Sequence, residues 1–152
     1  MVTQTVFRFR LERVRSVRER REKLARQELA SALTSRAATE QELKAEETRL
    51  ERVREQQREL ARGGATSAGD LADRQAYLER VEAQRTMREL ELAARDADVA
   101  ARGAQLRTAA SEHEMLERLR ERRRGEHERE LARLEGNALD EIAARRTGWG
   151  QA

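Results

Sequence analysis

Apolar residues recur at helical spacing through the first part of the chain, which has no glycine between Phe7 and Arg62. The intervals of three, four and seven residues are those of one face of an α-helix. Polar Arg36 and Gln57 fall on this stripe, which favours a moderately stable coiled coil over a strict zipper. The pattern predicts a helix over residues 7–62, with an apolar stripe formed by Leu11, Val14, Val17, Leu24, Leu29, Ala32, Leu43, Leu50, Val53 and Leu60.

A glycine-rich segment follows, with three of the chain's eight glycines between Arg62 and Gly69. We predict a turn at residues 63–69, after which Ser67, three residues before Asp70, can cap a new helix. The second helix is expected over residues 70–146, and residues 147–152 are expected to form a flexible tail. Its seven-residue ladder, interrupted by Arg85, consists of Leu71, Leu78, Leu92, Val99, Leu106 and His113.

These elements predict an all-α fold, an antiparallel coiled-coil hairpin that forms a single domain over residues 1–152. Folding back at the turn would place Leu60 near Leu71, Val53 near Leu78, Val14 near Leu116 and Phe7 near Arg124.

The second helix is the longer one, so residues after about Gly125 should overhang. This overhang carries an apolar strip on one helical face, which favours a binding site for another protein. The alternative is that the end frays, because Gly125, Gly136 and Asn137 weaken a helix. The strip consists of Leu131, Leu134, Ala138 and Ile142.

Composition supports long helices over a globular core. Charged residues make up 40% of the chain, aromatic residues only 3%, and proline is absent. Such a chain lacks the side chains for a thick core, while its abundance of helix formers argues against disorder. The 29 acidic and 32 basic residues are interspersed, as on a solvated helix surface.

Charge is uneven at the start, where residues 1–26 hold nine Arg or Lys against three Glu. In a hairpin this gives a basic arm at the open end, which is either a solvated face or a docking surface for an acidic partner.

No apolar stretch approaches the length of a membrane span, and the N-terminus lacks the apolar core of a secretory signal. The expectation is a cytoplasmic protein that is not transmembrane.

Catalytic and ligand-binding motifs are missing from the sequence. No cysteine occurs, and the two histidines lie outside any local cluster of metal-ligating residues. A polar residue such as His113 on a coiled-coil seam more often sets register than binds a ligand. We therefore expect no enzymatic activity, no cofactor and no metal.

Glutamates interrupt the arginine run of residues 118–124, so intrahelical ion pairs are favoured over nucleic-acid binding.

Several segments resemble the FliJ family of the flagellar type III export apparatus, in the same order and over nearly the whole chain. The opening residues 7–14 (FRFRLERV) and the late residues 140–143 (DEIA) carry most of the resemblance, because helical periodicity does not require them. Residues 77–82 (YLERVE) and 116–124 (LERLRERRR) add to it.

The resemblance implies a stalk that inserts its open end into the ring of the flagellar export ATPase. It also implies contact with the cytoplasmic domain of the export gate, assistance to export chaperones, and peripheral association with the inner membrane through the apparatus. Together with Leu134 of the overhang, the residues implied to bind partners are Phe7, Phe9, Leu11, Val14, Leu119, Arg122, Arg123, Asp140 and Ile142.

Two alternatives remain open. One is the stalk of a non-flagellar type III secretion system, which composition does not distinguish from a flagellar one. The other is a structural coiled-coil scaffold that buries the strip of residues 131–142 against a second copy. A stalk is expected to be monomeric without its partner, whereas a scaffold of this kind dimerises.

Overall fold

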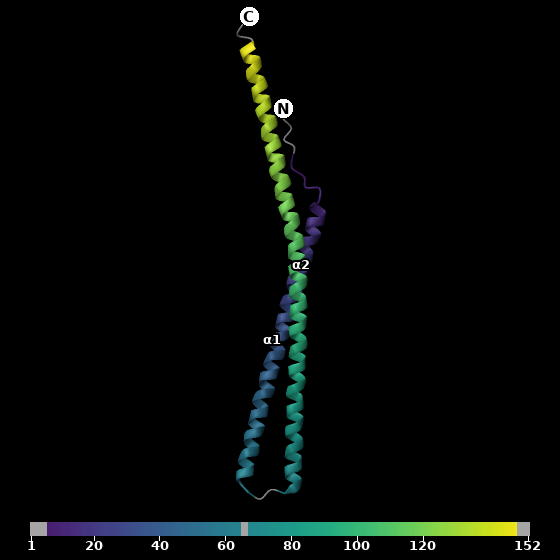
Figure 1. Cartoon of the computed structure of the whole chain (residues 1–152), viewed down its shortest axis with the longest axis vertical. Coiled ribbons are helices and arrows are strands. Elements are labelled where there is room, and N and C mark those ends of the chain that lie inside the picture. Colours follow the sequence, from purple (N-terminus) through teal and green to yellow (C-terminus); the bar gives the residue numbers. More distant parts are fainter. Residues whose placement is uncertain (1–5, 65–66, 149–152) are drawn as a thin grey trace. The chain divides into compact units, whose positions relative to one another are not determined.

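A computed structural model describes residues 6–64 and 67–148 of the chain. They form two α-helices, α1 (Glu12–Arg62, 51 residues) and α2 (Ala68–Gly148, 81 residues), labelled in Figure 1. The described residues contain no strand. The predicted all-α hairpin with a longer second helix is confirmed.

The turn between the helices follows from its glycines and its serine. Helix α1 ends at Arg62, as predicted, and the next residues include Gly64, whose φ of +79° is accessible to glycine at little cost. The backbone N–H of Asp70 donates a hydrogen bond of 3.1 Å to the Ser67 hydroxyl oxygen. This bond confirms the predicted cap, and it starts α2 at Ala68, two residues earlier than expected.

The outer ends of both helices differ from the prediction. Helix α1 begins at Glu12, so the prediction that it begins near Phe7 was wrong. The first backbone bond of the helix runs from the N–H of Arg15 to the carbonyl of Leu11. At the other end, α2 continues through Gly148, two residues into the predicted tail, and the rest of that tail lies outside the described residues.

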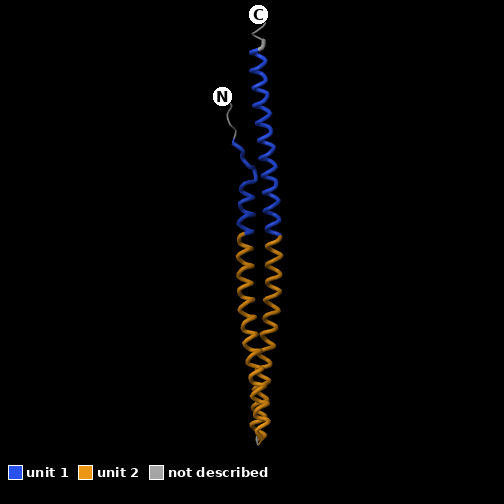
Figure 2. The backbone as a smooth tube through the Cα atoms, turned by 90° about the vertical axis from the view of Figure 1, so that its left-hand side faces the viewer, with its two compact units in different colours: residues 1–22, 108–152 blue, residues 23–107 orange. Residues whose placement is uncertain are grey.

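The chain divides into two compact units, coloured separately in Figure 2. We call residues 23–107 the turn unit, and residues 1–22 with 108–152 the terminal unit. Whether the two form a single domain, as predicted, stays a prediction. In both units, ion pairs join α1 to α2 in the antiparallel register predicted from the sequence. In the turn unit these pairs include Glu28–Arg102 (2.9 Å), Arg36–Asp96 (2.6 Å), Glu42–Arg88 (2.9 Å) and Arg54–Glu82 (2.9 Å).

Every buried side chain among the described residues belongs to the turn unit, and most are small: Ala25, Ala32, Thr39, Leu50, Val53 and Val81. The first three are seven residues apart, so they occupy one position of the heptad on α1. Predicted stripe residues Leu24 and Val17 are instead exposed, at 55% and 46%. Short side chains at the contact are buried, whereas Leu24 beside them projects past it.

Candidate protein-binding end of the chain

The segment before α1 follows the alternation of its sequence. Phe7 and Phe9 are half-buried, whereas Arg8 and Arg10 are exposed. Residues 6–9 form neither helix nor strand and residues 10–11 form a turn, and along this course the two aromatic side chains are partly covered while the two cations face solvent. A helix over the same residues would spread these side chains around its axis.

Phe7 lies against α2, with its ring centroid 5.8 Å from that of His127 and the two ring planes inclined at 41°. The sequence predicted that Phe7 would lie near Arg124, three residues earlier. The segment before Glu12 is not helical, and such a chain can advance up to about 3.3 Å per residue, compared with about 1.5 Å in a helix, so Phe7 reaches further along α2 than a helical register allows.

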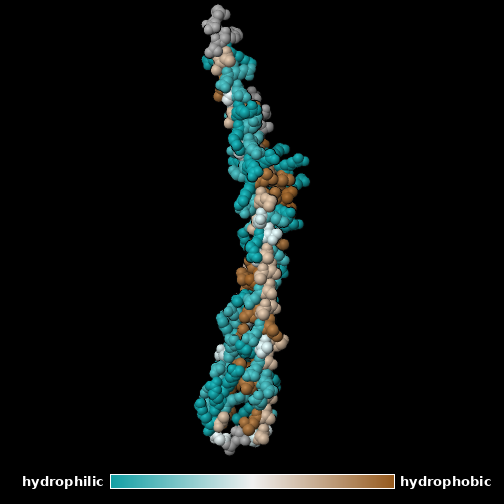
Figure 3. Space-filling view, viewed as in Figure 1, coloured by the Kyte–Doolittle hydropathy of each residue, from teal (hydrophilic) through white to brown (hydrophobic). Residues whose placement is uncertain are grey.

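A surface groove forms where this segment runs along α2. In Figure 3, hydrophobic side chains gather at this place in the terminal unit. The groove brings together five of the ten residues predicted to bind partners: Phe7, Phe9, Leu11, Leu119 and Arg123. Its remaining lining consists of Val6, Arg8, Arg10, Glu126, His127 and Glu130.

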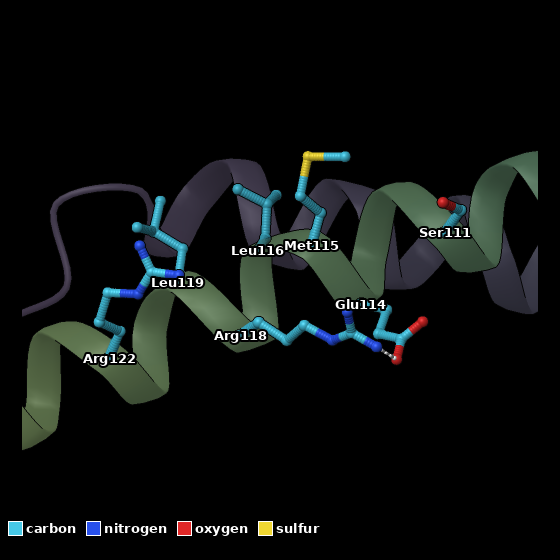
Figure 4. Close-up of a pocket in the computed structure, with 7 residues that line it drawn as sticks. All are labelled: Ser111, Glu114, Met115, Leu116, Arg118, Leu119 and Arg122. Atoms are coloured by element: carbon cyan, nitrogen blue, oxygen red, sulfur yellow. Dashed lines mark hydrogen bonds and ion pairs between the residues drawn. The ribbon is translucent and has the colours of Figure 1, made fainter.

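A second hollow lies on α2 alone (Figure 4), lined by Ser111, Glu114, Met115, Leu116, Arg118, Leu119 and Arg122. Within it Arg118 pairs with Glu114 one turn earlier, at 2.6 Å. Met115 is 67% exposed. Leu119 lines both this hollow and the groove, so it links Arg122 to the cluster around Phe7.

Polar contacts dominate the packing of α1 on α2 in the terminal unit, where no described side chain is fully buried. Arg15 pairs with Glu12 at 2.7 Å and with Glu117 of α2 at 2.5 Å. The hydrogen bond from Arg15 holds the pKa of the Glu117 carboxyl below its usual value, and the same guanidinium lowers the pKa of Glu12. Because such pairs are accessible to water, they stabilise the helix pair only modestly.

His113, predicted to lie on the coiled-coil seam, is part of this polar network. Its Nδ1 lies 2.6 Å from a Glu22 carboxylate oxygen, and its Nε2 lies 3.3 Å from a Glu117 oxygen. Arg18 pairs with Glu112 next to it. These contacts join α1 to α2 at a seam position without a large apolar side chain.

The overhang is helical, and all its described side chains from Ala132 to Arg146 are exposed. Leu134 and Ile142 are 49% and 54% exposed. Glu130 still lines the groove, so the overhang begins a few residues later than predicted. Helix formation continues through Gly136, which argues against fraying at that position.

The ten predicted residues therefore do not form one cluster. Asp140 and Ile142 lie on the overhang, and Ile142 is about 22 Å along α2 from His127 at 1.5 Å per residue. Val14 is exposed on α1 and lines neither groove nor hollow. The structure thus separates a cluster around Phe7, Leu119 and Arg123 from an apolar strip on the overhang.

The sequence prediction missed six of the groove's eleven lining residues, His127 among them, and five of the hollow's seven, Met115 among them. His127 was missed because a helical start at Phe7 gives the wrong offset along α2. Met115 was missed because it adjoins Leu116 outside the heptad ladder, although an exposed apolar residue beside a seam position could have been noted.

The described residues contain no helix long and apolar enough to cross a membrane. Across the same ranges, 6–64 and 67–148, no three His, Cys, Asp or Glu side chains are grouped so that they could hold a metal ion.

Comparison with protein-family models matched residues 7–150 to the model described as "Flagellar FliJ protein". No curated protein and no solved structure matched the chain. The matched range includes the hollow on α2, the overhang, the turn and all of the groove's lining except Val6.

Proposed function

Because the chain belongs to the FliJ family, a family of flagellar export components, we propose that it is the stalk that binds the flagellar export ATPase ring. The stalk also contacts the cytoplasmic domain of the export gate and assists the delivery of export chaperones and their substrates. In this role it is cytoplasmic, associates with the inner membrane through the apparatus, and is not an enzyme.

The observation that carries this proposal is the exposed apolar strip on the helical overhang. Leu134 and Ile142 lie at helical spacing with Ala138 between them, and no other part of the described chain covers them. A helix with one apolar face binds most readily in a groove of a partner, where that face leaves water. Burying an exposed Leu or Ile side chain contributes about 1.5–3 kcal/mol when burial is complete.

The groove around Phe7 supplies a second contact in the same unit. Its half-buried aromatic rings and exposed arginines resemble the composition of protein interfaces, in which aromatic residues and Arg are enriched. Contact at two places about 20 Å apart along α2 would fix the direction of the stalk inside a ring as well as its position. Such a stalk acts by binding energy alone. It stabilises the assembled ring, and its stiff helices transmit the conformational state of the ring.

A pull-down of the export ATPase from the same organism tests the proposal. The intact chain is compared with one carrying Phe7→Ser and Leu11→Ser and with one carrying Leu134→Ser and Ile142→Ser. A control chain carries four Ser substitutions at exposed apolar residues of the turn unit: Leu33, Leu71, Met87 and Leu90.

We expect the intact chain and the control to retain the ATPase, and each double variant to bind at least tenfold more weakly. Circular dichroism should show equal helix content in all four chains. Retention of the ATPase by both double variants would contradict the proposed contact end. Failure of the intact chain to bind would contradict the stalk itself.

Sedimentation at micromolar concentration separates the stalk from a self-associating scaffold. A stalk without its ring remains monomeric, because its apolar strip is short and interrupted by charged residues. A dimer that dissociates when Leu134 and Ile142 become Ser would instead assign the strip to a second copy of the chain.

A further inference from the structure

The first turns of α1 have two faces of different chemistry. Arg15 and Arg18 face α2, where they pair with Glu117 and Glu112. On the opposite face lie four exposed residues, which we call the arginine face: Arg13, Val17, Arg20 and Arg21. Their spacing of four, seven and eight residues from Arg13 places them together on the helix surface.

None of the three arginines of this face has an ion pair or hydrogen bond to another described residue. The nearby carboxylates are engaged elsewhere. Glu12 and Glu19 both pair with Arg15, at 2.7 and 3.6 Å, and Glu22 pairs with His113. The positive charge of the arginine face is therefore not neutralised locally, unlike that of most arginines on α2.

The segment before α1 extends this charge. Arg8 and Arg10 are exposed, have no ion pair within the described residues, and precede the arginine face in the chain. The first eleven residues contain no Asp or Glu that could neutralise them. Val6, at 81% exposure, and Val17, at 46%, stand among these arginines as exposed aliphatic side chains.

We propose that the arginine face, with Arg8 and Arg10, binds a membrane surface through its anionic phospholipid headgroups. Guanidinium groups form paired hydrogen bonds with phosphate oxygens, and short aliphatic side chains between them fit the boundary between headgroups and acyl chains. The arginine face lies on one side of a single helix. A planar anionic surface satisfies this arrangement, whereas an acidic protein would need matching shape as well as charge.

Arg13, Arg20 and Arg21 line neither the groove nor the hollow, whereas Arg8 and Arg10 also line the groove, so it is the arginine face that is separable from the ATPase contact. The chain would then reach the membrane directly as well as through its partners. The attraction is electrostatic, so it weakens with salt as the screening length falls to about 8 Å at physiological ionic strength.

Vesicle co-sedimentation of the full chain tests the proposal. The vesicles contain phosphatidylcholine alone or phosphatidylcholine mixed with phosphatidylglycerol, each at low and high sodium chloride. The test variant carries Arg13→Gln, Arg20→Gln and Arg21→Gln. The control carries Arg52→Gln, Arg62→Gln and Arg107→Gln, which remove the same charge at exposed, unpaired arginines of the turn unit.

We expect the intact chain to bind only the vesicles that contain phosphatidylglycerol, and to be released by salt. Each arginine near an anionic surface contributes roughly a fivefold gain in partitioning, so the test variant should bind about a hundredfold more weakly. The control should lose less than about tenfold, because its substituted residues lie outside the contact.

Equal binding to both kinds of vesicle, or an equal loss in test variant and control, would overturn the proposal. Absence of vesicle binding would overturn it too. If the test variant then also lost the ATPase in the pull-down, the arginine face would be assigned to an acidic protein partner. A chain that binds vesicles but not the ATPase would leave the membrane contact standing and contradict only the stalk.

Discussion

Val81 offers the sharpest test of how the two helices are held together. Its side chain is 1% exposed, the lowest value of any described apolar residue, and it lies in the turn unit, where all the buried described residues are found. Val81→Ala removes two methyl groups from this contact without changing charge or hydrogen bonding.

The expected magnitude follows from three terms. Loss of two buried methyl groups costs about 1.6 kcal/mol at roughly 0.8 kcal/mol each. The cavity left behind adds up to about 1 kcal/mol, because two helices can close over it only partly. Alanine is the better helix former by about 0.6 kcal/mol, which acts in the opposite direction. We therefore expect Val81→Ala to lower the free energy of unfolding by about 1–2 kcal/mol.

Urea unfolding followed by circular dichroism measures this change. With a slope of about 2 kcal/mol per molar urea, the midpoint should fall by about 0.5–1 M. Leu90→Ala is the matched control on the same helix, since Leu90 is 62% exposed and its truncation should move the midpoint by less than about 0.2 M. A shift as large in the control, or none in Val81→Ala, would refute the inference that the buried contacts of the turn unit stabilise the pair.

Three further predictions concern the turn and the terminal unit. Ser67→Ala should lower the free energy of unfolding by about 1 kcal/mol in a urea titration, because it removes the cap of α2, and Ser67→Asp should restore most of it. Gly64→Ala should lower the free energy of unfolding by about 1 kcal/mol, because residue 64 has a positive φ. Gly136→Ala, in open space on a helix, should raise the free energy of unfolding by up to about 1 kcal/mol, and effects of the same sign would contradict the backbone conformation at these two glycines. Because the pKa of Glu117 is lowered in the folded chain, its carboxylate stabilises the fold at pH values above its ordinary pKa of 4.5. This contribution is lost as the pH falls through the lowered pKa. Urea midpoints at pH 6 and pH 3 should therefore differ more for the intact chain than for Glu117→Gln, and equal differences would mean that the pair with Arg15 is not maintained.

The candidate site was predictable only in part. The sequence indicated that the two ends of the chain carry the contact surface, and the groove does unite Phe7, Leu119 and Arg123. It did not indicate that His127 is the neighbour of Phe7. Distances along a helix follow from residue number, but the path of a non-helical segment depends on which side chains it packs against.

The sequence by itself determined the two helices, the turn and the antiparallel register. These depend on interactions between near neighbours: apolar spacing, the glycines at residues 63 and 64, and the capping Ser67. Only the tertiary structure decided which side chains are buried and which arginines are neutralised. Ala25 and Ala32 are covered while Leu24 is exposed, and Arg15 is paired while Arg13 is not, because burial and pairing depend on the side of α1 that faces α2. Because the apolar stripe of α1 is wide, it leaves open which side of α1 faces α2 until the second helix packs against it.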